Sequence, residues 1–91
     1  MKHNTYFDGA VQSLGFAHAA GEATIGVMEP GAYEFSTGAP ERMQIVSGEI
    51  DYQLPGADWI SVAGGGSFDA PANAKFKVRV RTQLAYVCWF D

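Results

Sequence analysis

The sequence predicts an all-β fold, and three observations carry that prediction. Turn-forming residues recur every six to ten residues along the 91-residue chain. The segments between the turns are rich in Val, Ile, Phe, Tyr and Trp, which favour strands over helices. No stretch fits a helix of ten or more residues. We therefore expect a single domain, residues 1–91, of about eight to nine short antiparallel strands that close into a barrel or pack as two sheets, because either arrangement leaves few open edges.

The expected strands lie between the turn signals, with boundaries uncertain by about two to four residues. They are Ala10 to Ala17, Glu22 to Met28, Ala32 to Thr37, Arg42 to Ser47, Glu49 to Leu54, Trp59 to Val62, Gly66 to Ala70, Ala74 to Arg81 and Leu84 to Phe90.

Strand alternation sorts the side chains of these segments into an inner and an outer face. The residues expected to share inner faces are Tyr33, Phe35, Thr37, Glu41, Met43, Ile45, Phe76, Val78 and Val80. The last strand is apolar on both faces, with Tyr86, Cys88 and Phe90 on one side and Val87 and Trp89 on the other. A strand that is apolar on both faces indicates that both are covered, most simply in a homodimer.

Four of the six basic residues form a basic strip on the outer face of one predicted strand: Lys75, Lys77, Arg79 and Arg81. The strip could steer anions toward the protein. We favour the alternative that it is a solvated face whose like charges discourage edge-to-edge pairing.

Composition excludes several classes of protein. A net charge of −4 and a pI near 4.9 argue against general electrostatic binding to nucleic acid. No apolar run approaches the roughly 18 to 20 residues of a spanning helix, and the N-terminal residues lack the apolar core of a signal peptide, so we expect a cytoplasmic protein and no membrane partner. Cys88 is the single cysteine, which excludes an intrachain disulfide; we expect it to be buried and inert.

The stretch from residue 31 to residue 48 resembles the first signature of the cupin barrel, which implies a small cupin-type, jelly-roll-like fold. In that signature two histidines lie two residues apart, a glutamate follows, and a glycine comes after six more residues. Here the two histidine positions are Tyr33 and Phe35, the glutamate is Glu41, and the glycine is Gly48.

The second cupin signature matches from Gly65 through Pro71 to the third histidine position, which is Phe76. Asn73 stands at a glycine position and is suited to it, since asparagine adopts left-handed conformations more readily than most residues. A lone carboxylate cannot hold a catalytic transition metal, which needs several protein ligands, so we expect no bound metal. A metal cupin with unexpected ligands is the alternative, and it predicts activity that is lost to a chelator.

With these residues in view, the sequence resembles the pyrimidine/purine nucleoside phosphorylase family of small metal-free cupins, over nearly the whole chain. The matching residues are Tyr6, Phe7, Ser13 to Phe16, Gly26 to Met28, Gly31, Tyr33, Phe35 to Thr37, Pro40, Glu41, Met43, Val46 to Gly48, Leu54, Pro55, Trp59, Gly66 to Phe68, Pro71, Phe76 and Tyr86 to Cys88. The resemblance implies reversible phosphorolysis of purine and pyrimidine nucleosides to free base and ribose 1-phosphate. Inorganic phosphate is then the co-substrate, and no other cofactor is implied.

For that reaction a carboxylate near the sugar stabilises the positive charge that builds as the glycosidic bond breaks. Glu41 is the candidate catalytic residue, because the cupin pattern points it inward. Aromatic side chains stack on any base, which suits broad specificity. The candidate substrate-binding residues are Tyr33, Phe35, Ser36, Thr37, Met43, Ser47, Phe76 and Tyr86. For Phe76, as for Phe68, a purely core role is the stronger alternative.

Phosphate needs hydrogen-bond donors, and three hydroxyls near Glu41 could supply them: Ser36, Thr37 and Ser47. Alternation sends the neighbouring Arg42 away from Glu41, so the sequence offers no inward cation for phosphate. This leaves open a rival from another class, a non-catalytic cupin module that binds a small sugar-like or base-like ligand.

Overall fold

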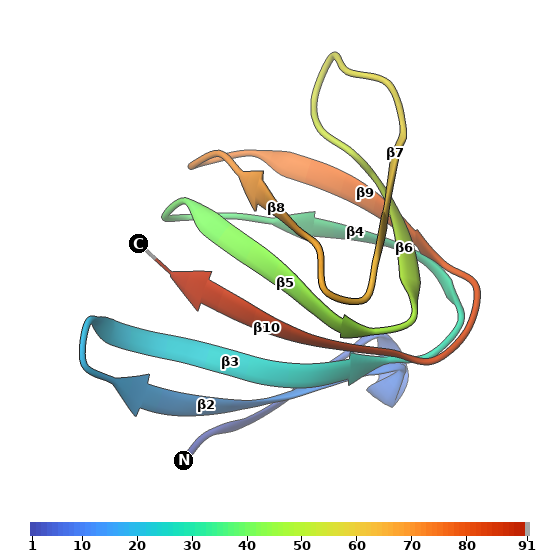
Figure 1. Cartoon of the computed structure of the whole chain (residues 1–91). Coiled ribbons are helices and arrows are strands. Elements are labelled where there is room, and N and C mark those ends of the chain that lie inside the picture. The colour runs from blue at the N-terminus through green and yellow to red at the C-terminus, as the bar shows by residue number, and fades with distance from the viewer. Residues whose placement is uncertain (91) are drawn as a thin grey trace.

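The computed structural model describes residues 1–90, which form ten β-strands and one 3-10 turn (Figure 1). The elements are β1 (His3–Tyr6), η1 (Phe7–Gly9), β2 (Val11–His18), β3 (Gly21–Met28), β4 (Gly31–Ser36), β5 (Glu41–Ser47), β6 (Glu49–Gln53), β7 (Ile60–Ala63), β8 (Ser67–Ala70), β9 (Lys75–Val80) and β10 (Leu84–Phe90). Among these residues no helix is long and apolar enough to cross a membrane.

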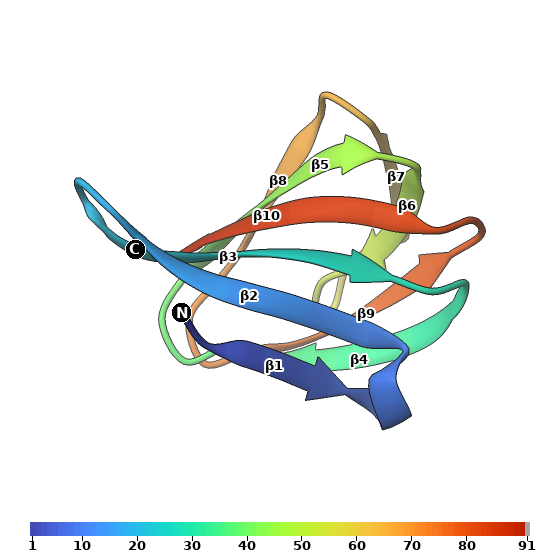
Figure 2. The same ribbon diagram turned by 90° about the horizontal axis from the view of Figure 1, so that it is seen from below.

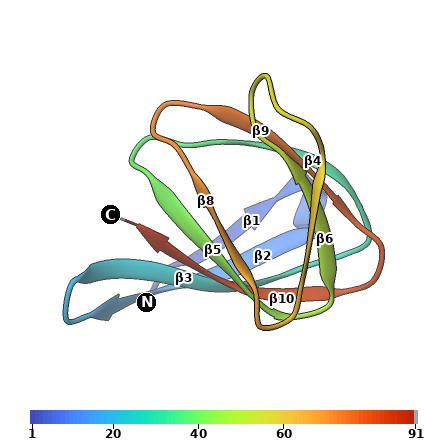
Figure 3. The ribbon, with the colours of Figure 1, turned by 45° about the horizontal axis from the view of Figure 1, so that its top comes forward.

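The all-β class is confirmed, and each of the nine expected strands is present within the stated boundary error. The expected number of eight to nine strands is too low, because β1 pairs with β2 as an edge strand (Figure 2). The strands form two antiparallel sheets, of order β1-β2-β3-β10-β5-β8 and β4-β9-β6-β7. Closure into one barrel is therefore not confirmed; the fold is a two-sheet sandwich, seen with the sheets facing each other in Figure 3.

The core lies between the two sheets and follows from strand alternation. β9 buries every second side chain, and β10 and β5 do the same over most of their length. The side chains that are almost fully inaccessible come from both sheets: Val11, Met28, Ile45, Ile50, Val78 and Leu84. Each such side chain stabilises the fold by about 1.5–3 kcal/mol relative to exposure. The inner-face assignment of β5 and β9 is thereby confirmed.

The residues that match the cupin signatures have physical roles at the turns. Gly48 joins β5 to β6 with φ 95°, and a Cβ there would lie 2.8 Å from the carbonyl oxygen of Gln83. A larger residue would therefore be strained and also crowded by backbone. Asn73 has φ 52°, which confirms the left-handed conformation expected for it.

The basic strip lies on the exposed face of β9 and just beyond its end, as expected, but its proposed role at an edge is wrong. β9 pairs with β4 on one side and β6 on the other, so it has no open edge. Two of its arginines instead cover the buried Asp51: Arg81 Nη2 lies 2.7 Å and Arg79 Nε 3.8 Å from Asp51 Oδ2. Ser61 donates a hydrogen bond to Oδ1 of the same carboxylate, and Arg79 stacks on the Trp59 ring. These contacts satisfy a carboxylate that would otherwise be costly to bury.

Candidate functional site

A cavity of about 280 Å³ lies between the sheets, with side chains from both sheets in its wall. It brings together six of the nine residues predicted to form the site: Phe35, Ser36, Glu41, Met43, Phe76 and Tyr86. Residues from β4, β5, β9 and β10 thus meet at one place although they are far apart in the sequence. This cavity is the candidate functional site.

The other three predicted residues do not line the cavity. Tyr33 is buried in the core and donates a hydrogen bond from its hydroxyl to the Glu29 carbonyl oxygen, 2.7 Å away. Thr37 Oγ1 donates to the Pro71 carbonyl oxygen at 2.6 Å and accepts from the Ala74 amide at 3.0 Å, so it fastens the end of β4 to the turn before β9. Ser47 is exposed at the end of β5. The structure gives Tyr33 and Thr37 structural roles.

Glu41 begins β5 and is half-buried, with its carboxylate toward the cavity. In the sheet it pairs with Phe90 of β10 on one side and Ala70 of β8 on the other. Cys88, two residues before Phe90 and therefore on the same face of β10, donates a hydrogen bond from its thiol to Glu41 Oε1 at 3.3 Å. The sheet register thus places a thiol beside the candidate catalytic carboxylate.

Burial sets the protonation of these two groups. It raises the pKa of the Glu41 carboxyl above its usual 4.5, and the hydrogen bond from Cys88 offsets part of that rise. Burial, followed by the nearby Glu41 charge, raises the pKa of Cys88 far above that of a free thiol. Cys88 therefore remains a protonated hydrogen-bond donor at neutral pH and does not act as a nucleophile.

Tyr86 lies on the cavity wall opposite a glycine that makes room for its ring. It pairs with Gly26 of β3, and a Cβ at Gly26 would lie 2.7 Å from the Tyr86 hydroxyl oxygen. Burial raises the pKa of Tyr86 to about 12, while a hydrogen bond with Ser13 works against that rise. The phenol is consequently protonated at neutral pH and, with Ser13, supplies a polar patch inside the cavity.

Aromatic rings form a continuous row across the space between the sheets. Phe35 lies 5.8 Å from Phe76, and Phe76 lies 6.1 Å from Phe68, measured between ring centroids. Phe76 and Phe68 are 2% and 5% exposed. Both rings belong to the core cluster, and Phe76 also lines the cavity. Phe35 is only partly buried, and Phe7 of η1 packs edge-on against it at 5.6 Å.

The wall of the cavity carries acidic side chains and neutral donors. Glu34 and Glu41 supply carboxylates, and no Lys, Arg or His from the described residues is among the lining residues. Arg42 points elsewhere, as alternation predicted, and its Nε lies 3.0 Å from Asp69 Oδ1 on the exposed surface. A ligand in this cavity is therefore met by hydroxyls, a thiol and carboxylates.

The cupin metal positions do not fit a divalent metal. The Tyr33 hydroxyl is committed to a backbone carbonyl, and Phe35 and Phe76 have no donor atom, which leaves the Glu41 carboxylate alone. Among residues 1–90 no group of three or more His, Cys, Asp or Glu side chains is placed to hold a metal ion.

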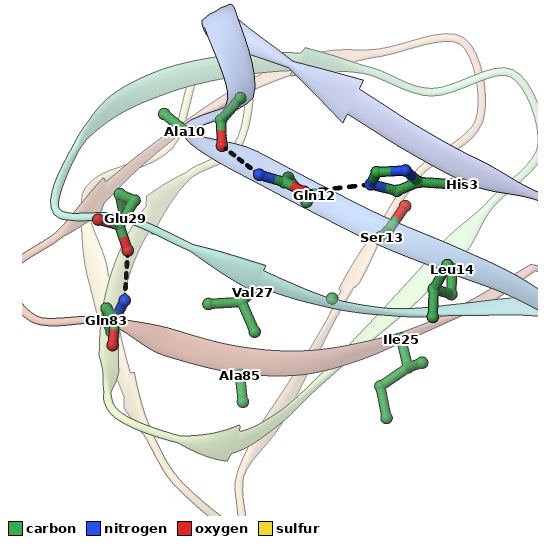
Figure 4. A pocket seen from close by; sticks show the side chains of 12 residues that line it. His3, Ala10, Gln12, Ser13, Leu14, Ile25, Val27, Glu29, Gln83 and Ala85 are labelled. Atoms are coloured by element: carbon green, nitrogen blue, oxygen red, sulfur yellow. Dashed lines mark hydrogen bonds between the residues drawn. The ribbon is translucent and has the colours of Figure 1, made fainter.

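A second, broader hollow of about 850 Å³ lies on the outer face of the six-stranded sheet (Figure 4). Its floor is apolar, with Leu14 from β2 and Ile25 and Val27 from β3 in its wall. Glu29 lies at its margin, where it accepts a hydrogen bond from Gln83. This hollow shares Ser13 with the interior cavity, but its one carboxylate, Glu29, is exposed, so we do not assign the chemistry to it.

Sequence reasoning missed eight residues that line the interior cavity: Tyr6, Phe7, Ser13, Thr24, Met28, Glu34, Cys88 and Phe90. Alternation along the last strand had already grouped Cys88 and Phe90 with Tyr86, which was a usable signal. For Ser13 and Thr24 the signal is weaker, because it depends on which strands pair. For Phe7 strand alternation gave no signal, since this residue lies in a turn.

The comparisons with known proteins agree with this architecture. Residues 1–90 match the family model described as "Pyrimidine/purine nucleoside phosphorylase". A protein of that name from Pseudomonas syringae pv. syringae is 50% identical over 89 residues, which cover 97% of this chain and 96% of the relative.

Solved structures give the same result for the fold. A Vibrio parahaemolyticus protein described as of unknown function superimposes with a TM-score of 0.92 at 44% identity, covering 96% of this chain and 94% of that one. The cupin domain of Schizosaccharomyces pombe Cnp3 has a TM-score of 0.70 at 14% identity, covering 100% of this chain and 69% of that one, and so shares the fold alone. The fold is that of a cupin, and the chain belongs to the pyrimidine/purine nucleoside phosphorylase family.

Proposed function

We propose that this protein is a broad-specificity nucleoside phosphorylase, which converts a purine or pyrimidine nucleoside and inorganic phosphate into free base and ribose 1-phosphate. The observation that supports it best is the interior cavity, where a half-buried carboxylate on β5 faces aromatic and hydroxyl groups in a family of that name. Glycosidic bond cleavage needs this combination of a negative charge for the sugar and a flat apolar wall for the base.

In the proposed reaction the bond between C1′ and the base nitrogen breaks, and its electron pair leaves with the base. A phosphate oxygen forms the new bond to C1′, and the base takes up the proton that the phosphate releases. The Glu41 carboxylate stabilises the positive charge that develops on the sugar between these two events. The Tyr86 hydroxyl and the Cys88 thiol, both protonated, donate hydrogen bonds within the same cavity.

Phosphate is held in this proposal by neutral donors. Hydroxyls of Ser13, Ser36 and Tyr86 line the cavity, whereas no cationic side chain from the described residues does. Hydrogen bonds from neutral groups are weaker than charge-assisted ones, so we expect phosphate to bind loosely. The experiment is incubation of pure protein with uridine or adenosine, with and without phosphate, followed by an assay for free base. Absence of phosphate-dependent release above a boiled control would rule the activity out.

A non-catalytic ligand-binding module is the second candidate, and it is favoured because none of the described residues that line the cavity is cationic. Titration with a nucleoside and with phosphate, followed by chromatography of the recovered ligand, separates the two functions. A binding module returns the nucleoside intact, while a phosphorylase returns free base.

We further propose that the protein is a homodimer that buries the outer face of the six-stranded sheet against a second copy. Three apolar side chains at the centre of this face are 40–49% exposed: Leu14, Ile25 and Val27. Val87 of β10 continues the same face, as the apolar alternation of the last strand predicted. Contiguous apolar surface of this kind usually marks an interface, and a two-fold axis lets one patch pair with itself.

Ile25→Glu is expected to convert a dimer into a monomer, because it places a charge at the centre of the apolar face. Ile60→Glu is the matched control, since both isoleucines are 49% exposed and Ile60 lies on β7 of the other sheet. Molar mass from light scattering after gel filtration gives the answer. A wild-type monomer, or an Ile25→Glu variant that stays dimeric, would contradict the proposal.

A further inference from the structure

We propose that Phe7 is the ring on which the nucleobase stacks, and that the left-handed turn of η1 exists to hold this ring over the cavity. The proposal rests on the nucleoside-binding part of the proposed function. Phe7 lines the interior cavity and is 46% exposed, so one side of the ring is open to a ligand.

The backbone at this position is unusual for its residue types. Phe7 and Asp8 have φ of 53° and 55°, and Gly9 follows with φ 88°. Left-handed φ is costly for residues with a Cβ, and phenylalanine has no short polar side chain that could offset the cost with a local hydrogen bond. The turn is closed by a hydrogen bond from the Ala10 amide to the Phe7 carbonyl oxygen, at 3.1 Å, and the Gln12 side chain donates to the Gly9 carbonyl oxygen at 3.0 Å. Strained backbone of this kind persists where the surrounding structure over-determines it, and it clusters at functional sites.

Core packing does not account for the strain, because the ring is not buried. A phenylalanine that served the core would be nearly inaccessible, as Phe76 and Phe68 are at 2% and 5% exposure. Phe68 does not line the cavity, and Phe76 lines it with little exposed surface, whereas Phe7 is open. The turn therefore keeps an apolar ring at the mouth of the cavity, at a cost in backbone conformation.

Contacts across the sandwich fix the orientation of the ring. Phe7 follows β1 in the six-stranded sheet, yet its ring lies 4.9 Å from Tyr33 and 5.6 Å from Phe35, both on β4 of the other sheet. The contact with Phe35 is edge-to-face, with an interplanar angle of 86°. Tyr6 and Phe90 also line the cavity with comparable exposure, at 47% and 38%. Phe7 combines that exposure with ring contacts that hold it still, which is what a stacking platform requires.

Stacking on an aromatic side chain recognises the π-face that all bases share, so it agrees with broad base tolerance. Removing one stacking ring typically weakens binding by about 5- to 150-fold. We expect a loss in that range for purine and pyrimidine nucleosides alike.

The test uses uridine and adenosine as probes, with phosphate left out so that no turnover occurs, and measures the dissociation constant by calorimetry. Phe7→Gly removes the ring and also relieves the positive φ, so its unfolding midpoint is expected to stay close to that of the wild type while binding of both probes weakens about 5- to 150-fold. Asp8→Gly is the matched control: it relieves the same strain at the next residue but keeps the ring, and it is expected to bind as the wild type does.

Phe7→Leu keeps apolar bulk without the π-face and is expected to weaken binding within the same range; it serves as the second variant if Phe7→Gly unfolds. Binding by folded Phe7→Gly or Phe7→Leu within twofold of the wild type would overturn the proposal. If wild-type protein binds nucleosides but releases no base with phosphate, the proposed reaction fails while the stacking test still stands. If wild-type protein binds neither probe, both fail.

Discussion

Replacing Glu41 by glutamine is expected to lower turnover of uridine or adenosine by about 10²- to 10³-fold, the effect of removing one preorganised charge-stabilising group. The variant keeps an oxygen within reach of the Cys88 thiol, so the hydrogen bond across β5 and β10 can persist and the fold is expected to remain intact. Steady-state kinetics with saturating phosphate and nucleoside measure the change. Glu34→Gln is the control, since it removes the other carboxylate of the cavity wall from an exposed position.

The same substitution should raise stability at neutral pH. Glu41 has a raised pKa in the folded protein, so the folded state holds this proton more tightly than the unfolded chain does. Stability is then lost as the pH rises from the usual value of 4.5 through the raised pKa, and glutamine, which cannot ionise, avoids that loss. The free energy of unfolding in urea, compared between wild type and Glu41→Gln at neutral and acidic pH, measures this difference in stability.

For the catalytic role, unchanged turnover in Glu41→Gln would show that Glu41 is not part of the site.

In the proposed reaction the ionised form of Glu41 stabilises the charge on the sugar. The pKa of Glu41 is raised above its usual 4.5, so turnover is expected to fall as the pH drops through that raised pKa. The thiol of Cys88 lowers that pKa by its hydrogen bond, so Cys88→Ala should shift the acidic limb of the kcat profile to higher pH. Cys88→Ser, which keeps a donor, should leave the limb closer to its wild-type position. An identical limb in all three proteins would contradict the role assigned to this pair.

Phe76→Ala is expected to destabilise the protein by about 3–5 kcal/mol, as removal of a buried phenylalanine does. Its ring is 2% exposed and lies between Phe35 and Phe68, so the substitution opens a cavity in the centre of the sandwich. The free energy of unfolding in urea measures the loss. Phe90→Ala, at a ring that is 38% exposed, should cost clearly less. A Phe76→Ala variant as stable as the wild type would show that this ring faces an open pocket and not the core.

The sequence predicted the strands and their faces well because both depend on local alternation. Phe76, Val78 and Val80 are buried as the pattern required, and the basic strip on the opposite face is exposed. The signature positions were also predictable, since Gly48 and Asn73 sit where the backbone is left-handed. These features follow from the chemistry of single residues in a strand or a turn.

Features that depend on long-range pairing could not be predicted. Which strand lies beside β5 decides that Cys88 reaches Glu41, and the two residues are 47 positions apart. β1 is short and mostly exposed, so it shows no alternation before it pairs with β2. The hydrogen bonds of Thr37 could not be predicted either, because its partners, the Pro71 and Ala74 backbone groups, come from a distant turn.

The place of Phe7 in the cavity wall illustrates the same limit. A phenylalanine before Asp-Gly is typical of the start of a turn. The local sequence does not predict that the backbone is left-handed at Phe7 and Asp8, or that the Phe7 ring contacts β4. The site is assembled from both sheets, so its composition becomes visible only when the sheets are placed together.

Identification of the sugar product tests the proposed reaction most directly. Wild-type protein, uridine and inorganic phosphate are followed together by phosphorus NMR for the sugar ester and by chromatography for uracil. The proposed phosphorolysis predicts a new ribose 1-phosphate signal that grows in equal amount with free uracil and is nearly absent in Glu41→Gln. Free uracil accompanied by unphosphorylated ribose, or uridine recovered intact, would contradict it.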